Sequence, residues 1–334
     1  MTAALKRQGD EARRSGQGSQ RLSGIDAVRA AMAFLVIVLH AIQFGDEDRL
    51  HMTLQIFSLP LRAAVPFFFI ASGFFIKQRD RLTPDIVVQP MIRLLPIYVF
   101  WVAVYYVAAA LIPGHASAFH LRDIVMGGPA FHLWFLPALG ISMVLVAVGL
   151  PVVRWRVTGI VCALIAAVGL ARGSYHDVLH LHGSASRGGI MVAPLFVYLG
   201  AAIRARSLTL SSLVSLGGIA ASLLALYCEE VWIGAQTHAD FSSHDFALMT
   251  YPLGIFCFFL ALSLPNSGIV EKIATLGKYS LGVYTSHLLF LWIAFAISGA
   301  MAVFILPNSL AAFAAGLAIS IVLSRSKIFR RVVS

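Results

Sequence analysis

Residues 25–44 read IDAVRAAMAFLVIVLHAIQF, and this run decides the class of the protein. A helix needs about 20 predominantly apolar residues to cross the hydrocarbon core of a bilayer, and the run has that length. Its only ionisable side chains are Asp26, Arg29 and His40. The run therefore predicts a membrane-spanning helix.

Nine further apolar runs follow along the chain. They lie near residues 54–76, 94–112, 132–152, 157–171, 190–203, 212–228, 246–264, 280–298 and 300–323. Over all 334 residues, 59% are hydrophobic and only 12% are charged, which excludes an ordinary soluble protein. We predict an all-α, polytopic integral membrane protein with about ten transmembrane helices. The fifth and sixth runs and the closely spaced last pair are the weakest.

The Lys and Arg residues predict the orientation of these helices. With the N-terminus inside, nineteen of the 25 lie in cytoplasmic segments and four in external loops. Because positive charge collects on the cytoplasmic side, both termini are predicted to be cytoplasmic. The chain then has a basic tail at 1–24, a single membrane domain at 25–324 and a short basic tail at 325–334. We attribute the net charge of +10 to this orientation, with the bilayer as partner and no nucleic acid.

One face of the first helix carries unusual side chains. Ionisable groups inside the bilayer cost roughly 2.5–3.5 kcal/mol each, so each needs a reason. Arg29 and His40 are eleven residues apart, which places them on one face about 16 Å apart along the axis, and Asp26 joins that face one turn below Arg29. We interpret this face as the lining of a channel that runs inward from the cytoplasm. For a lone membrane histidine such as His287, a hydrogen bond that joins two helices explains the residue equally well.

Other residues in the apolar runs have simpler explanations. Ser72 and Gly73 form a small pair among bulky side chains, and close helix packing explains the pair better than a ligand does. Trp134 suits the interfacial belt at the external surface, whereas His132 beside it is less well explained. His176, His180 and His182 match no specific metal motif, so we expect no bound metal.

Five segments, taken in chain order, resemble the motifs of the acyltransferase 3 family. They are Ile25-Asp26-Ala27-Val28-Arg29 with His40, Ser72-Gly73-Phe74, Arg93-Leu94-Leu95-Pro96-Ile97-Tyr98, His132-Leu133-Trp134-Phe135-Leu136, and Gly277-Lys278-Tyr279-Ser280-Leu281-Gly282-Val283-Tyr284 with His287. Members of this family are bacterial integral-membrane enzymes that O-acylate cell-surface or secreted glycans and some small molecules. The chain departs from the pattern at Ala30, where the family usually has Gly, and at Pro90, where an arginine usually precedes Arg93 by three residues.

The resemblance implies ten helices in the cytoplasmic (inner) membrane, an acyl-CoA donor, most often acetyl-CoA, a carbohydrate acceptor and an essential His40. We expect His40 to act as general base toward the acceptor hydroxyl or to form an acyl-histidine intermediate. Further roles are expected as follows: Asp26 orients Arg29; Ser72 offers an oxyanion donor; Arg29 and Arg93, assisted by Arg79 and Arg81, bind the donor phosphates; His132, Trp134, Tyr284 and His287 line the acceptor site.

A transporter or flippase for a glycan or another polar substrate is the alternative function. Membrane-embedded Arg and His residues are equally expected in that class. Transport favours paired repeats, and no symmetry relates residues 1–165 to residues 166–334. Some family members carry an extracytoplasmic domain that completes transfer. The resemblance therefore implies that this chain either finishes the reaction within its membrane domain or hands the acyl group to a separate partner, such as a glycan-assembly protein.

Overall fold

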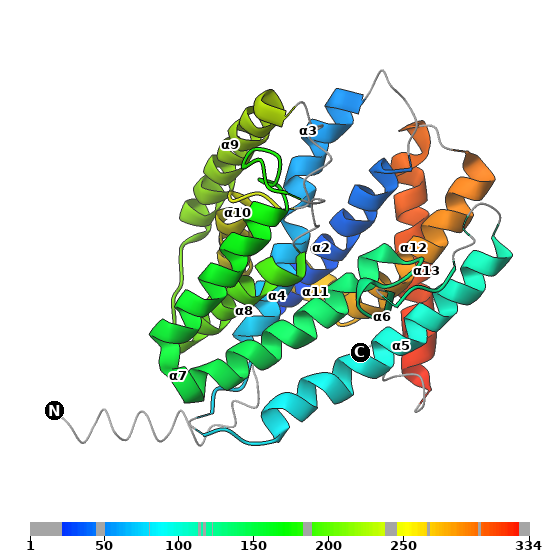
Figure 1. The fold of residues 1–334 in the computed structure, drawn as a ribbon. Helices are drawn as coiled ribbons and strands as arrows, with labels where there is room; N and C mark the ends of the chain where they lie inside the picture. The colour runs from blue at the N-terminus through cyan, green and yellow to red at the C-terminus, as the bar shows by residue number, and fades with distance from the viewer. Residues whose placement is uncertain are drawn as a thin grey trace.

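The structure is a computed structural model that describes residues 22–44, 51–79, 81–112, 115, 118–121, 123–182, 189–237, 246–265, 268–299 and 302–326. Over these residues the chain is a bundle of helices without a β-strand (Figure 1). The predicted all-α class is therefore confirmed. Most of both predicted basic tails, residues 1–21 and 327–334, lies outside the described part.

The helices follow one another through the whole described chain. They are α2 (Ser23–Ile42), α3 (His51–Leu61), α4 (Ala64–Phe74), α5 (Asp85–Leu111), α6 (Asp123–Met126), η1 (Phe131–Trp134), α7 (Phe135–Arg172), α8 (Gly189–Ala205), α9 (Ser212–Thr237), α10 (Thr250–Ser263), α11 (Gly268–Gly277), α12 (Ser280–Ser298), η3 (Ala302–Phe304) and α13 (Ile305–Arg325). In the described ranges, seven helical stretches are long and apolar enough to cross a membrane, and α8 and α10 are shorter apolar helices.

Helix α7 folds back on itself. Its 38 residues would extend about 57 Å as a straight helix, well beyond the roughly 30 Å hydrocarbon core. Arg154 breaks the helix with φ 64° and ψ 172°, three residues after Pro151. Figure 1 shows the two limbs meeting at a sharp bend. These limbs correspond to the predicted runs 132–152 and 157–171, which the sequence analysis separates at the same place.

Helix α2, which carries Arg29 and His40, lies at the centre of the helix bundle. It packs against six other helices, namely α3, α4, α10, α11, α12 and α13 (Figure 1). Helix α11, which the hydrophobic runs did not predict, lies beside the start of α2 because Gly277 lets the Asp26 backbone approach where a Cβ would collide with it. This contact brings the chain after α11 close to the charged end of α2.

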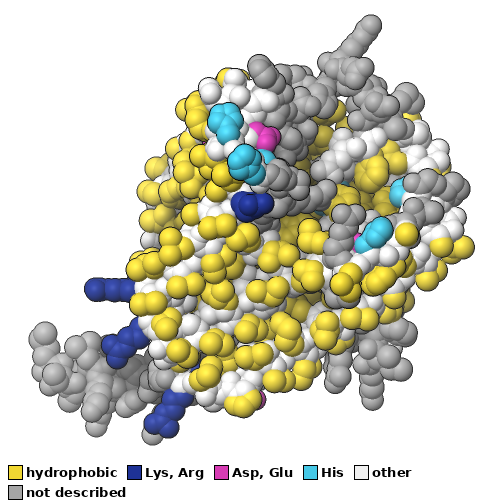
Figure 2. All heavy atoms as spheres, viewed as in Figure 1, with side chains coloured by type: hydrophobic (Ala, Val, Ile, Leu, Met, Phe, Trp, Pro, Cys, Tyr) yellow, Lys and Arg dark blue, Asp and Glu magenta, His cyan; other side chains and the backbone are white. Residues whose placement is uncertain are grey.

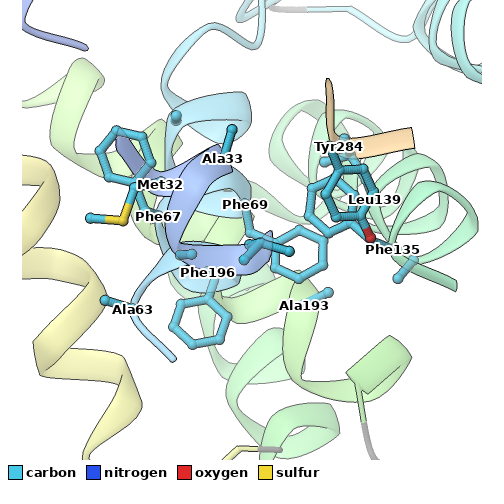
Figure 3. Close-up of a cluster of buried hydrophobic side chains, with 14 of the residues drawn as sticks. Met32, Ala33, Ala63, Phe67, Phe69, Phe135, Leu139, Ala193, Phe196 and Tyr284 are labelled. Carbon is cyan, nitrogen blue, oxygen red and sulfur yellow. The ribbon is translucent and has the colours of Figure 1, made fainter. Parts of the chain in front are cut away.

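Aromatic rings fill the core next to α2. Phe69 of α4 lies 4.6 Å from Phe135 of α7 between ring centroids, and Phe135 lies 5.1 Å from Tyr284 of α12 (Figure 3). Gly73 and Gly200 lie directly against the facing helix backbone, so α4 and α8 approach closely. Close packing is therefore the role of Gly73, as its small size predicted.

The molecular surface has an apolar middle and polar ends. Figure 2 shows hydrophobic side chains over most of the visible face, with most of its Lys and Arg side chains near the bend of α7. The His side chains on this face lie away from that bend. An apolar middle between polar ends is expected for a protein whose helices cross a membrane.

Candidate active site

Three histidines from separate parts of the sequence meet beside α2. The ring of His40 stacks on that of His287 from α12, with centroids 5.3 Å apart and planes 16° from parallel. His132 of η1 lies 4.7 Å from His287 and 6.1 Å from His40. His132 is 2% exposed and His287 is fully buried. The structure thus joins the predicted catalytic histidine to two predicted acceptor-site histidines in one cluster.

The hydrogen bonds of His287 determine its tautomer. Its Nδ1 lies 2.5 Å from the carbonyl oxygen of Tyr284. A carbonyl oxygen only accepts, so Nδ1 carries the proton and Nε2 carries the lone pair. Among the described residues, that Nε2 and both ring nitrogens of His132 are buried without a hydrogen-bond partner. Buried polar atoms normally have partners, so these nitrogens mark a place where a substrate atom can be bound.

Tyr105 of α5 supports the cluster from behind. Its hydroxyl donates to the Thr285 carbonyl at 3.0 Å and accepts from the Leu289 amide at 3.1 Å. These two groups are i, i+4 partners in α12, so the hydroxyl bonds to the helix backbone on both sides of His287. The Tyr105 ring also lies 5.4 Å from the ring of His132. Tyr105 therefore contacts the ring of His132 and the backbone on both sides of His287.

A cavity of about 590 Å³ lies at the charged end of α2. Its cations are Arg29, Arg93 and Lys278, and its apolar wall includes Phe68 and Leu139. Phe135 and Tyr284 also line it, and the Tyr284 hydroxyl donates to the His132 carbonyl. The cavity therefore ends against a residue that is bonded to the histidine cluster.

Asp26 and Arg29 form an ion pair on the wall of this cavity. An Arg29 nitrogen lies 3.2 Å from a carboxylate oxygen of Asp26, one helical turn away. The guanidinium also lies 5.3 Å from the ring centroid of Phe75. The expected orienting contact between Asp26 and Arg29 is present in the geometry. These contacts hold the guanidinium at the cavity, where it can meet an anionic ligand.

The remaining predicted residues lie in different places. Ser72 lines the cavity but donates its hydroxyl to the Phe68 carbonyl at 2.8 Å, so an oxyanion role requires that hydroxyl to rotate away from its own helix. Arg79 lines a neighbouring cavity, and Arg81 is exposed and lines neither. Trp134 packs against Phe69 and Phe246 through its ring, apart from the three histidines.

The sequence matches the acyltransferase domain family over residues 22–325. This match includes every residue of the cavity and of the histidine cluster. The chain belongs to the acyltransferase 3 family. The five motifs therefore predicted the family correctly, and the acyltransferase domain covers nearly the whole chain, including its apolar helices.

Two distant relatives of this chain are named as racemases. An amino-acid racemase of Enterococcus faecalis is 26% identical over 324 residues, which cover 88% of this chain and 44% of that protein. A serine/alanine racemase of Enterococcus gallinarum is 26% identical over 272 residues, which cover 71% of this chain and 36% of that protein. The chain thus spans less than half the length of these curated relatives. No solved structure matches it.

Two residues of the site were not predicted from the sequence. Lys278 was part of a quoted motif but had no assigned role, and Tyr105 was not singled out. The signal for Tyr105 was a hydroxyl inside an apolar run, which needs a partner when it is buried. Within the described residues, no group of three His, Cys, Asp or Glu side chains has the arrangement of a metal site.

Proposed function

We propose that this acyltransferase moves an acyl group, acetyl in the first instance, from cytoplasmic acyl-CoA to a hydroxyl of an exported or surface carbohydrate. The observation that carries the proposal is that Tyr284 joins two features: it lines the cavity that holds Arg29, Arg93 and Lys278, and its hydroxyl donates to the carbonyl of His132 in the histidine cluster. The donor has its phosphates at one end and its thioester at the other, which matches cations in the cavity and imidazoles beyond Tyr284.

The donor phosphates bind at the entrance of the 590 Å³ cavity. Arg29 and Arg93 suit this role because the planar guanidinium forms two parallel, charge-assisted hydrogen bonds with a phosphate. Lys278 adds a third cation, and Asp26 keeps Arg29 in place. The acyl-bearing arm then lies along Phe68 and Leu139 toward Tyr284, with its thioester next to the histidines.

His40 removes the proton from the acceptor hydroxyl. Its Nδ1 lies 3.4 Å from the Gln43 side-chain oxygen; with the proton on Nδ1, Nε2 holds the lone pair. The acceptor oxygen attacks the thioester carbon as Nε2 takes the proton, the carbon–sulfur bond breaks, and the sulfur leaves with that proton as free CoA. In the acyl-histidine route the imidazole nitrogen attacks the thioester carbon and CoA leaves as its thiolate. The acceptor oxygen then attacks the acyl carbon, the carbon–nitrogen bond breaks, and the acceptor proton passes to the CoA thiolate. The unpartnered Nε2 of His287 supplies a second lone pair for either route.

The proposed topology has ten crossings and both termini in the cytoplasm of a bacterial inner membrane. Ten crossings result when the two limbs of α7 count separately and the short helices α8 and α10 are included. Arg154 at the α7 bend and Arg204 at the end of α8 would then both lie on the cytoplasmic side, in accord with the positive-inside rule. The same side holds the proposed donor entrance.

The racemase activity of the relatives is not part of the proposal, because those names belong to proteins more than twice as long as the aligned part. The test of the proposal is group transfer itself. Membranes containing the protein are incubated with acetyl-labelled acetyl-CoA and a glycan acceptor from the source cells. We expect the label to appear in carbohydrate as an alkali-labile ester. Accumulation of intact glycan across the membrane without acetyl transfer would instead favour the transporter function.

A further inference from the structure

A second cavity lies beside the donor entrance. It measures about 560 Å³ and is formed where α4 and α8 end. Among the described residues, its charged lining is basic and comprises Lys77, Arg79 and Arg204. Phe75 lines both this cavity and the 590 Å³ cavity, so the two are neighbours that share one wall.

Two of the basic residues of this second cavity, Arg79 and Arg204, have contacts with neighbouring side chains. The Arg204 guanidinium lies 5.4 Å from the ring centroid of Phe74, and Gln78 donates to the Ala201 carbonyl at 3.3 Å, which ties the chain after α4 to α8. Arg79 pairs with Asp85 at 3.4 Å. Among the described residues, neither Lys77 nor Arg204 has a carboxylate within ion-pair distance. Two cations therefore remain available to an anionic ligand.

A phosphate group is the anion that this arrangement suits. Arginine binds phosphate through two parallel hydrogen bonds, and lysine adds a compact positive charge. The cavity lies at helix ends, where either a soluble phosphate compound or the headgroup of an anionic lipid could present that group. The shared Phe75 wall favours the donor, because one molecule can then reach both cavities. Coenzyme A has the required form: its 3′-phosphate lies on the ribose, apart from the diphosphate that precedes the acyl-bearing arm.

We propose that the cavity lined by Lys77, Arg79 and Arg204 binds the 3′-phosphate of the acyl-CoA donor, while the 590 Å³ cavity takes the diphosphate and the acyl-bearing arm. This inference rests on the proposed function. It assigns Lys77 and Arg204 to donor recognition and gives Arg79 a place separate from that of Arg29 and Arg93. It also predicts that the enzyme distinguishes CoA esters from otherwise identical esters of dephospho-CoA.

The test compares two donors and three variants. Protein in phosphatidylcholine nanodiscs is supplied with glycan acceptor and with either acetyl-CoA or acetyl-dephospho-CoA, which lacks only the 3′-phosphate, and thiol release is measured. Loss of one charged contact should raise KM about tenfold. We expect that rise when the wild type receives the dephospho donor and when Arg204→Gln receives acetyl-CoA. In Arg204→Gln the difference between the donors should become smaller, because only Lys77 and Arg79 remain to meet the 3′-phosphate, and in Lys77→Gln/Arg204→Gln it should become smaller still.

Arg206→Gln is the matched control, because Arg206 lies two residues further on, contacts the Trp155 ring and does not line the cavity. It should discriminate between the donors as the wild type does. A wild type that uses both donors equally, or an Arg204→Gln variant that discriminates as strongly as the wild type, would overturn the inference while leaving the proposed function intact. A wild type that cleaves neither donor would contradict the proposed function and the inference with it.

Nanodiscs with added phosphatidylglycerol distinguish the lipid from the donor. If Arg204 binds a lipid headgroup, its replacement changes the rate only when anionic lipid is present, and by the same factor for both donors. That result would overturn the assignment to the donor. If Arg204 binds the 3′-phosphate, the effect of Arg204→Gln depends on the donor in both lipid compositions.

Discussion

The three imidazoles of the site differ in how they are held. His40 is near Gln43 and exposes part of its ring, whereas His132 and His287 are buried. The lone pair on His287 Nε2 follows directly from the bond between Nδ1 and the Tyr284 carbonyl. This geometry makes His287 a candidate for the chemistry itself and extends the acceptor-binding role expected from the sequence.

His287→Asn tests that role. The asparagine amide can still donate to the Tyr284 carbonyl, because its nitrogen takes the place of Nδ1, but nothing replaces Nε2. If the lone pair takes part in proton transfer, kcat should fall about 100-fold. The measurement is the rate of acetyl transfer at saturating donor. His182→Ala, which changes an exposed histidine outside the cluster, serves as control. A His287→Asn enzyme with wild-type kcat would exclude the lone pair from the reaction.

The sequence identified the cluster's members but not their contacts. His40, His132 and His287 stood out because charged or polar groups are rare in apolar runs. Their convergence depends on tertiary packing of α2, η1 and α12, which no spacing in one helix encodes. Trp134 shows the opposite case, since its motif suggested the acceptor site and its ring packs between Phe69 and Phe246.

At the scale of the elements, Tyr105 links α5 to α12 next to His287. Tyr105→Phe keeps the ring and removes the hydroxyl that bonds to the Thr285 carbonyl and the Leu289 amide. We expect kcat to fall about tenfold, while the melting temperature changes little because those two groups are i, i+4 partners within α12 and can satisfy each other. Steady-state kinetics measures kcat, and thermal unfolding in detergent measures the melting temperature. A large loss of stability with unchanged kcat would make Tyr105 a packing residue only.

A buried ion pair joins α9 to the connection between α3 and α4. Arg62 and Glu230 lie 2.5 Å apart with side chains 5% and 0% exposed. Removing one partner leaves the other charge buried, which costs roughly 3–5 kcal/mol, whereas apolar replacement of both is far less damaging. Glu230→Leu should therefore lower the unfolding temperature strongly, and Arg62→Leu/Glu230→Leu should recover most of the loss. A double variant as unstable as the single one would contradict this.

Element boundaries could be predicted where the hydrophobic pattern changes. The polar stretch with Arg154 and Arg156 separated the two limbs of α7 correctly. The pattern did not show that the run 54–76 is interrupted at Arg62 and Ala63, because the flanking residues are equally apolar. It also missed α11, whose ten residues are too short and too polar to form a membrane run.

At the scale of the whole molecule, the account requires the α7 bend and the donor entrance on the cytoplasmic side. Single cysteines placed at Arg156 and at His182, in a chain with Cys162, Cys228 and Cys257 replaced, test this orientation. A membrane-impermeant maleimide should label the cysteine at 182 in intact cells and the cysteine at 156 only after lysis. The reverse pattern would invert the topology and place the donor cavity on the side without acyl-CoA.

Thiol release from acetyl-CoA by the purified protein in nanodiscs tests whether His40 catalyses acyl transfer from this donor. The wild type and His40→Ala are compared with and without glycan acceptor. We predict release by the wild type and a loss of about 100-fold or more in folded His40→Ala, in keeping with the removal of a general base. Full activity of His40→Ala, or the absence of any acyl-CoA binding and cleavage by the folded wild type, would contradict the account.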